Sequence, residues 1–399
     1  MLVSAAMVLL MTHGLALFYG GMVRKKNVLG TIMHSFIAIA LVSVQWIIIG
    51  YSLAFGPDIK GIIGGLDWAF LNNVGLSPNP DYAKTVPHLA FMIYQAMFAV
   101  ITPALISGAL AERIKFSSFV LFTVLWSTFI YAPVAHWVWG KGGWLGALGA
   151  LDFAGGIVVH VTSGLSALSA ALYIGKRKGY PHEITPPHNL PLTVIGTGIL
   201  WFGWFGFNGG SALVSGALST VAFVTSHIAA VSAVVIWITI EWFHQGKATV
   251  FGAATASVAG LATITPAAGY VSPMHALIIG LLAGAVCYTA LNLKPRLGYD
   301  DSLDAFGVHG VGGIIGTICV GVFASLAIND AGANGLLFGG SKQFLVQTMA
   351  AAVVGIYSFV VTALLLKIVD LVTGGVRVNH ENETEGLDVT QHGESGYYF

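Results

Sequence analysis

Two histidines, His160 and His309, lie in stretches of sequence that resemble each other. The stretches are LDFAGGIVVHVTSGLSALSAALYIG (151–175) and DAFGVHGVGGIIGTICVG (304–321), and each combines an aspartate and a phenylalanine with glycines, valines and one histidine. An imidazole in hydrocarbon is costly and usually faces a cavity or a partner. Because the surroundings repeat, we predict that these two histidines form one functional site. Other histidines in apolar runs lack such a repeat and are assigned to packing, namely His13, His34, His227 and His275.

Paired imidazoles in a dry lumen have a limited chemistry. Desolvation disfavours imidazolium, so both rings are expected to be neutral, each with one donor and one acceptor. Such a pair can share a proton and exchange hydrogen bonds with a small polar guest. It cannot stabilise a bare cation.

Aromatic side chains offer a separate place for a cation. Tyr94 and Phe98 are spaced i, i+4 on one helix face, and Trp139 is expected in the loop after the fourth apolar segment. Ring faces attract cations, and Ser211, just beyond the sixth segment, could accept a hydrogen bond from one. The alternative is an ordinary aromatic belt at the membrane interface.

Helices must position the two histidines. Asp152 and Asp304 are expected to cap these helices, because a carboxylate accepts from the free N–H groups of the first turn. His160 lies about 12 Å along its helix from Asp152, and His309 lies about 8 Å from Asp304 on the opposite side. The hydrocarbon core of a membrane is about 30 Å thick, so the two rings can meet only if the tenth segment begins below the membrane surface.

Composition identifies an integral membrane protein. Of the 399 residues, 56% are hydrophobic and only 9% are charged, against about 25% charged in soluble domains. The 51 glycines suit closely packed helices. A net charge of zero provides no electrostatic attraction for nucleic acid. The two cysteines fall in apolar runs and are assigned to the core.

Eleven apolar segments are candidate membrane spans, and an odd number places the termini on opposite sides. Positive charges follow the first segment instead of preceding it, which favours an outer N-terminus. Thirteen of the 17 lysines and arginines then lie inside, as the positive-inside rule expects. The long last segment should be tilted. The segments are 2–20, 28–55, 88–110, 117–135, 153–175, 191–207, 217–243, 249–265, 273–293, 305–325 and 344–373.

Sequence features recur at an offset of five segments. FYGG (18–21) closes the first segment and FNGG (207–210) closes the sixth, while the histidine stretches form the fifth and tenth. Segments five apart run in opposite directions. We therefore predict an all-α polytopic membrane protein with an inverted five-plus-five helix repeat around a narrow pore.

The chain is expected to divide into a transmembrane channel domain, residues 1–375, and a cytoplasmic C-terminal tail, residues 376–399, that is disordered or regulatory. The outer loop 57–87 is interpreted as a surface cap. The basic inner loop 176–189 is interpreted as a membrane anchor or a docking face.

Nine motifs, in order and spread over nearly the whole chain, resemble the ammonium transporter family (Amt/Mep/Rh), in its Amt type. They are ALFYGGMVRKKN, ALAERIKF, AHWVWG, LDFAGGIVVH, TPPHNLP, GWFGFNGGSA, TPAAGY, DAFGVHGVGG and EGLDVTQHGE. The resemblance implies a plasma-membrane homotrimer, one pore per subunit and no enzymatic activity. The EGLD segment is similar to the tail through which PII-type signal proteins regulate such transporters.

The resemblance also implies roles for single residues. Phe98, Trp139 and Ser211 resemble the outer ammonium recruitment site, with Tyr94 one turn away and Asp152 supporting the vestibule. Phe98 and Phe207 resemble the stacked rings that close the pore, and His160 and His309 the twin histidines of the lumen.

Ammonium transport is therefore the expected function. Ammonium, with a pKa near that of lysine, about 10, would bind as the cation, lose a proton on desolvation and pass as ammonia. Its proton is either returned or relayed along the imidazoles, and potassium is rejected. No cofactor is expected. Alternatives are an ammonium sensor with little flux, a gas channel of the Rh type, and a membrane cytochrome b that uses the histidines as haem ligands.

Overall fold

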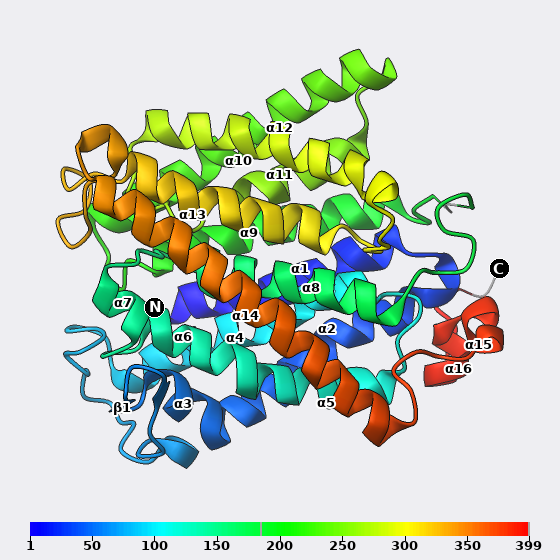
Figure 1. The fold of residues 1–399 in the computed structure, drawn as a ribbon, viewed down its shortest axis with the longest axis horizontal. Coiled ribbons are helices and arrows are strands. Elements are labelled where there is room, and N and C mark those ends of the chain that lie inside the picture. Colours follow the sequence, from blue (N-terminus) through cyan, green and yellow to red (C-terminus); the bar gives the residue numbers. More distant parts are fainter. Residues whose placement is uncertain (184–185, 398–399) are drawn as a thin grey trace.

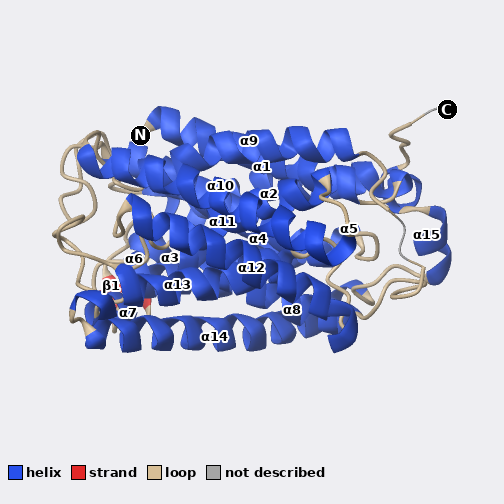
Figure 2. Cartoon of the chain, turned by 90° about the horizontal axis from the view of Figure 1, so that it is seen from above, coloured by secondary structure: helices blue, strands red, loops and turns tan. Residues whose placement is uncertain are grey.

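The computed structural model describes residues 1–183 and 186–397, and these form a bundle of membrane-length helices. The helices run between two loop-covered ends (Figures 1 and 2). The N-terminus lies at the end that carries the short helix α7 and the strand β1, here called the amino end. The C-terminus lies at the opposite end, here called the carboxy end, with helices α15 and α16. The prediction of an all-helical polytopic protein is confirmed.

Six long helices are uninterrupted, and one further uninterrupted helix is short. The long ones are α1 (Leu2–Met22), α4 (His88–Leu110), α9 (Leu190–Gly210), α10 (Ala217–Gln245), α12 (Pro273–Leu297) and α14 (Ser341–Thr373), and the short one is α11 (Val250–Ile264). By length and composition, ten helices of the described chain can cross a membrane, while α11 has only 15 residues. Almost every α11 side chain is buried, because the helix packs among α9, α10, α12 and α13. The eighth predicted span, 249–265, thus corresponds to a short helix that is buried inside the bundle.

Four spans are assembled from an α-helix and a π-helical turn. They are α2 (Val28–Gln45) with η2 (Trp46–Gly50) and α3 (Tyr51–Phe55), α5 (Phe116–Trp126) with η4 (Ser127–Tyr131) and α6 (Ala132–Trp139), η5 (Gly156–Val161) with α8 (Thr162–Ile174), and η6 (Phe306–Gly310) with α13 (Val311–Phe323). Turns of this kind are rare and occur mostly at functional sites. Both histidines of the predicted pair lie on them.

Glycines allow close contact between the spans that the predicted repeat relates to each other, the first with the sixth and the fifth with the tenth. A Cβ added to Gly196 of α9 would lie 2.3 Å from the Phe18 backbone nitrogen of α1. A Cβ on Gly164 of α8 would lie 2.1 Å from the Gly310 Cα. Only glycine fits at such approaches, so these residues hold the first span against the sixth and the fifth against the tenth.

The last helix, α14, lies on the outside of the bundle and crosses its neighbours obliquely (Figure 1). Its 33 residues extend about 50 Å, more than the hydrocarbon core requires. This agrees with the predicted tilt of the last span.

Short elements cover the two ends. At the amino end are β1 (Asp58–Ile59), β2 (Ile63–Gly64), η3 (Ala69–Leu71), α7 (Trp144–Leu148) and η7 (Leu336–Phe338). Beyond η1 (Lys25–Asn27), the carboxy end has α15 (His380–Glu385) and α16 (Leu387–His392). The Asp388 carboxylate accepts from the Gly30 N–H at 2.8 Å, and the Leu387 N–H donates to Asn27 Oδ1 at 2.8 Å. The alternative of a disordered tail is therefore wrong for residues 376–397.

Candidate functional site

The rings of His160 and His309 face each other at the centre of the bundle. Their centroids are 5.2 Å apart and their planes are 12° from parallel, and both side chains are buried. Among the described residues, neither nitrogen of His160 has a hydrogen-bond partner, and neither does Nδ1 of His309. The two rings therefore meet as the sequence indicated, and three of their four nitrogens make no hydrogen bond within the described residues.

The two rings meet because the tenth span starts inside the protein. The preceding segment buries Asp300 and Asp301, so η6 begins below the surface at Phe306. The Phe306 N–H donates to Asp301 Oδ2 at 2.7 Å. Asp304 instead pairs with Lys294, Nζ to Oδ1 2.5 Å. The prediction that Asp304 caps this helix is thus wrong, since Asp301 does so.

Asp152 caps the fifth span as predicted. Its Oδ1 accepts from the N–H groups of Gly155 and Gly156, at 2.9 and 2.6 Å, and its Oδ2 from those of Ile157 and Val158, at 2.9 and 3.0 Å. Four amide donors hold the buried carboxylate and also define the start of the π-helical turn that carries His160.

A cavity of about 10 Å³ contains the histidine pair. This is roughly the space that one water molecule needs. Except for the imidazoles, its walls are apolar or aromatic: Met11, Leu15, Ile101, Leu105, Val159, Leu200, Trp204, Phe207 and Val258. The cavity fits a single small molecule and is far too small for a haem, which argues against the cytochrome alternative.

The rings of Phe98 and Phe207 stack at the amino end of this lumen. Their centroids are 4.2 Å apart, and Phe207 lies 6.2 Å from the His160 ring. The Tyr94 hydroxyl lies 2.8 Å from the Phe207 carbonyl oxygen and 3.0 Å from that of Gly206. Tyr94 thereby fixes the end of α9 that carries Phe207.

Above the stacked rings lies a second cavity, of about 220 Å³, which we call the amino-end pocket. Phe98 forms part of its floor, and Trp139 stands 6.0 Å from Phe98 at 88°. Trp139 is the last residue of α6, so its predicted place in a loop is wrong. The pocket is lined by Phe55, Asp81, Tyr82, Phe91, Gln95, Phe98, Trp139, Asp152, Phe153, Ser211 and Leu213.

Polar atoms line this pocket beside the rings. The Ser211 hydroxyl donates to the Phe207 carbonyl at 2.8 Å and lies 3.2 Å from the Tyr94 hydroxyl, so its oxygen has acceptor capacity beside the rings. The Gln95 Oε1 is buried and has no partner within the described residues. Sequence reasoning missed Gln95, although it lies three residues before Phe98 and so on the same helix face.

The cap loop also contributes to the pocket. Asp81 and Tyr82 line it, and Lys141 pairs with Asp81, Nζ to Oδ1 2.5 Å. The loop 57–87 is therefore more than the passive cap that the sequence indicated, because it places a carboxylate at the pocket mouth.

The histidines assigned to packing contact aromatic neighbours instead of the lumen. His34 lies 4.3 Å from the Phe119 ring and His275 lies 5.1 Å from the Phe323 ring. His13 and His227 contact Phe36 and Trp201 at 5.0 and 5.5 Å. The assignment agrees with these positions.

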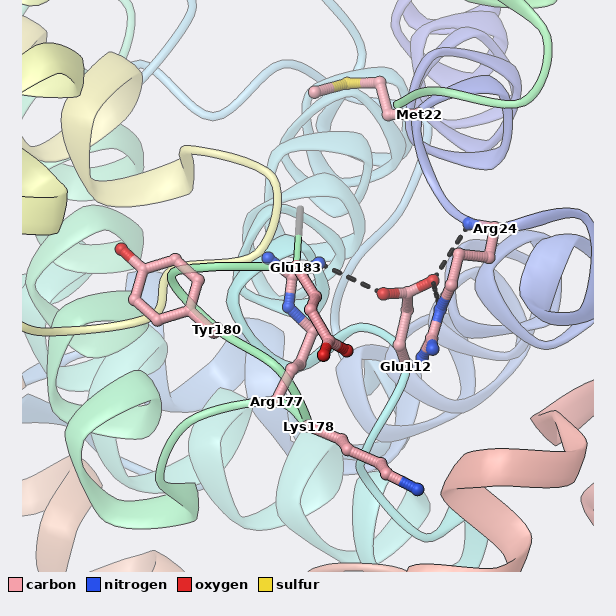
Figure 3. Close-up of a pocket in the computed structure, with 7 residues that line it drawn as sticks. All are labelled: Met22, Arg24, Glu112, Arg177, Lys178, Tyr180 and Glu183. Atoms are coloured by element: carbon pink, nitrogen blue, oxygen red, sulfur yellow. Dashed lines mark hydrogen bonds and ion pairs between the residues drawn. The ribbon is translucent and has the colours of Figure 1, made fainter. Parts of the chain in front are cut away.

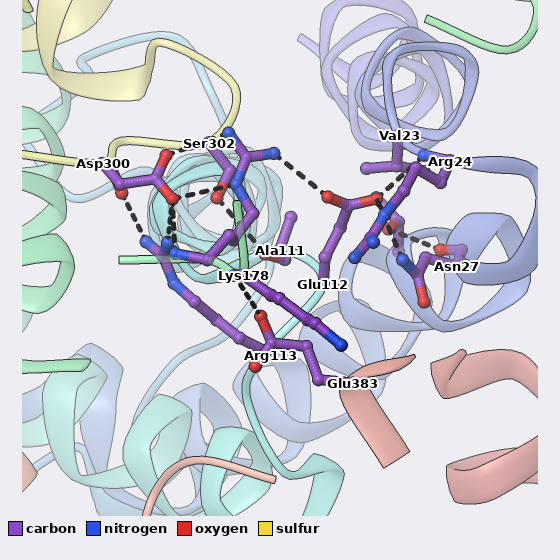
Figure 4. Close-up of polar contacts among 12 residues, drawn as sticks. Val23, Arg24, Asn27, Ala111, Glu112, Arg113, Lys178, Asp300, Ser302 and Glu383 are labelled. Atoms are coloured by element: carbon purple, nitrogen blue, oxygen red, sulfur yellow. Dashed lines mark hydrogen bonds and ion pairs between the residues drawn. The ribbon is translucent and has the colours of Figure 1, made fainter. Parts of the chain in front are cut away.

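Charged side chains form a buried cluster at the carboxy end (Figures 3 and 4). Glu112 accepts from Arg24 at 2.9 Å and from Arg177 at 3.0 Å, and Arg177 also pairs with Asp300 at 2.9 Å. Burial opposes the charge of the Glu112 carboxylate, but Arg177 and Arg24 hold its pKa down at about 2. A cavity of about 40 Å³ adjoins this cluster.

The inner loop and the tail join this cluster. The Lys178 N–H donates to Glu383 Oε1 at 2.9 Å, and Glu383 also pairs with Arg377 at 2.7 Å. Part of the loop 176–189 is thus occupied by contacts within the protein. Residues 184–185 of this predicted loop lie outside the described residues.

Comparisons with known proteins agree over the whole chain. The profile of the Ammonium Transporter Family matches residues 1–397. An ammonium transporter of Bacillus subtilis is 51% identical over 398 residues, which are 100% of this chain and 97% of the relative. Ammonium transporter Amt1 of Archaeoglobus fulgidus is 48% identical, covering 99% and 97%.

Solved structures give the same result. Mep2 of Candida albicans is similar with a TM-score of 0.91 and 36% identity, covering 99% of this chain and 89% of that one. A structure described as a sensor Amt protein is similar with a TM-score of 0.90 and 32% identity, covering 98% and 96%.

Proposed function

The chain belongs to the ammonium transporter family, and we propose that it carries ammonium across a membrane through the amino-end pocket and the histidine-lined lumen. The observation that best supports this proposal is the position of the stacked Phe98 and Phe207 rings. It separates a pocket with ring faces and polar acceptors from a lumen with unpartnered imidazole nitrogens. A cation suits the first compartment and a neutral molecule suits the second.

Recruitment takes place in the amino-end pocket. Ammonium is almost entirely the cation at pH 7, because its pKa is near that of lysine, about 10. The faces of Phe98 and Trp139 attract this charge, and Ser211 Oγ accepts one of its N–H groups. The four donors on Asp152 keep that carboxylate fixed beside the pocket.

Deprotonation accompanies entry into the lumen. Leaving the polar pocket for an apolar space disfavours the charged form, so ammonium gives up its proton near the stacked rings. Ammonia then passes His160 and His309, whose free nitrogens exchange hydrogen bonds with it. The proton returns to the pocket or is relayed along the imidazoles. Potassium has no proton to release and stays excluded.

The membrane setting follows from the charge distribution. The amino end faces outward and the carboxy end faces the cytoplasm, since most lysines and arginines then lie inside. The site is in the plasma membrane, in a homotrimer. Residues 1–375 form the transport domain and residues 376–399 a regulatory tail. The described part of the tail, 376–397, offers a PII-type signal protein a folded surface at the cytoplasmic face. The docking of α16 against α2 and η1 supports this division.

Sensing is a second candidate function. The similarity to a protein described as a sensor Amt protein favours it. A sensor would bind ammonium in the same pocket with little flux through the lumen.

Solid-supported membrane electrophysiology of the purified protein distinguishes these functions. Jumps of ammonium, and separately of potassium, are applied to wild type and to the double variant His160→Ala/His309→Ala. A transient for ammonium alone that the double variant lacks would establish charge-carrying transport through the histidine-lined lumen. Alkalinisation inside vesicles without a current would identify a neutral ammonia channel. If neither signal occurs, transport is refuted and the sensor remains.

A further inference from the structure

Two glutamines of α14 project into the protein at the amino end. The exposed fraction of Gln347 is 0% and that of Gln343 is 6%, although α14 lies on the outside of the bundle. Gln343 Nε2 donates to the Gly149 carbonyl at 3.0 Å and to Gln347 Oε1 at 3.1 Å. Burial of a primary amide is costly unless its polar atoms are paired.

Gln347 pairs with both backbone groups of Leu151. Its Oε1 accepts from the Leu151 N–H at 2.7 Å, and its Nε2 donates to the Leu151 carbonyl at 2.7 Å. Nε2 also lies 3.4 Å from the Thr317 carbonyl oxygen of α13. The N–H belongs to the peptide group between Ala150 and Leu151 and the carbonyl to the one between Leu151 and Asp152, so this two-point contact holds the backbone on both sides of Leu151.

The second of these peptide groups leads directly into Asp152. The Asp152 carbonyl accepts from the Trp139 indole N–H at 2.8 Å, and its carboxylate caps η5. The contacts therefore run from Gln347 through Leu151 and Asp152 to the Trp139 ring in the amino-end pocket. Gln347 itself is not among the residues that line this pocket.

We propose that Gln347 is a positioning residue for ammonium recruitment, which sets the Trp139 ring through the backbone of Leu151 and Asp152. This inference rests on the proposed function, because it assigns Gln347 to the affinity of the same pocket. It gives α14, the span outside the predicted five-plus-five repeat, a part in substrate binding.

The test is a double-mutant cycle between Gln347→Met and Trp139→Phe. Methionine matches the length of glutamine but makes neither contact to Leu151, and phenylalanine keeps a ring but lacks the indole N–H. The ammonium concentration dependence of the current gives KM and the maximal current. In the wild-type background we expect Gln347→Met to raise KM roughly fivefold with the maximal current retained, the size of a lost hydrogen bond.

The Trp139→Phe background separates positioning from a general structural effect. If Gln347 acts through the indole, Gln347→Met raises KM less than about twofold there, because the contact it supports is already gone. An equal rise in both backgrounds, or no rise in either, overturns the inference. Gln45→Met is the matched control. Gln45 is also buried and donates to Thr128 Oγ1 at 3.0 Å, away from the pocket, so KM should not change.

A substitute variant and the activity of the wild type keep the test of Gln347 separate from the test of the proposed function. If the Gln347→Met protein does not fold, Gln343→Met takes its place in the double-mutant cycle, because it removes the hydrogen bond from Gln343 to Gln347. We then expect a smaller rise in KM in the wild-type background and no rise in the Trp139→Phe background. A wild-type protein without current or alkalinisation refutes the proposed function and this inference together. An active wild type with an additive cycle refutes the inference alone.

Discussion

The imidazoles of His160 and His309 lie face to face, with ring planes 12° apart, and come from two π-helical turns at the starts of different spans. The geometry gives the lumen two stacked rings, and within the described residues both nitrogens of His160 and Nδ1 of His309 make no hydrogen bond to the fold. Function should therefore be more sensitive to these residues than stability is.

His160→Ala is expected to lower the ammonium-dependent current by at least about tenfold, because the lumen loses an acceptor that no neighbour replaces. The thermal stability in detergent should stay close to that of wild type, since the ring makes no hydrogen bond within the described chain. His227→Ala, at an exposed histidine against Trp201, serves as the control and should keep its current. A His160→Ala protein with full current would contradict a role for the pair.

Gln95→Leu is expected to raise the KM for ammonium by roughly three- to tenfold, because the amino-end pocket loses a buried carbonyl acceptor. Titration of the current with ammonium measures this change. The matched variant is Gln45→Leu, whose Oε1 is also buried and unpartnered in the described structure but lies outside the pocket. Equal KM values for both variants would show that Gln95 does not contribute to ammonium binding.

Asp152→Asn is expected to lower the free energy of unfolding by about 2 kcal/mol, because a neutral amide cannot accept four N–H bonds as the carboxylate does. Thermal unfolding in detergent checks the loss, and the current should fall with it as the start of η5 loosens. Asp67→Asn, at an exposed position of the cap loop, is the comparison. An Asp152→Asn protein as stable as this control would refute the capping role.

Acid should weaken the carboxy-end cluster through Glu112. Its folded-state pKa of about 2 lies below the ordinary value of about 4.3, so the stabilisation is complete above the ordinary value and is lost as pH falls toward 2. This lowering of the Glu112 pKa corresponds to a contribution of about 3 kcal/mol at most to the free energy of unfolding. Melting curves between pH 6 and pH 3 should fall more steeply for wild type than for Glu112→Gln. Parallel curves would show that Glu112 does not contribute.

The fold was largely predictable because apolar runs and the positions of positive charges determine membrane spans. The histidine pair was predictable because its surroundings repeat. The inset start of the tenth span was not, since it requires burial of Asp300 and Asp301. Sequence alone does not show that Arg113 pairs with Asp300, or that Lys294 donates to the Asp301 carbonyl. For the same reason the cap was assigned to Asp304 instead of Asp301.

Other parts of the site were hidden for different reasons. A π-helical turn adds a residue to a turn without changing the apolar pattern, so η4 and the extension of α6 to Trp139 left no signal. Gln347 acts on a peptide 196 residues away in sequence. Contacts of a side chain with a distant backbone have no residue pattern that would reveal them.

The charge cluster at the carboxy end also dictates an order of assembly during synthesis. Arg24 emerges before Glu112, but Arg177 follows 65 residues after Glu112, and Asp300 another 123 residues later. Glu383, which holds the Lys178 N–H, comes later still. A growing chain therefore carries incompletely paired charges at this end until the tail arrives, so docking of α15 completes the folded protein and distinguishes it from any shortened product.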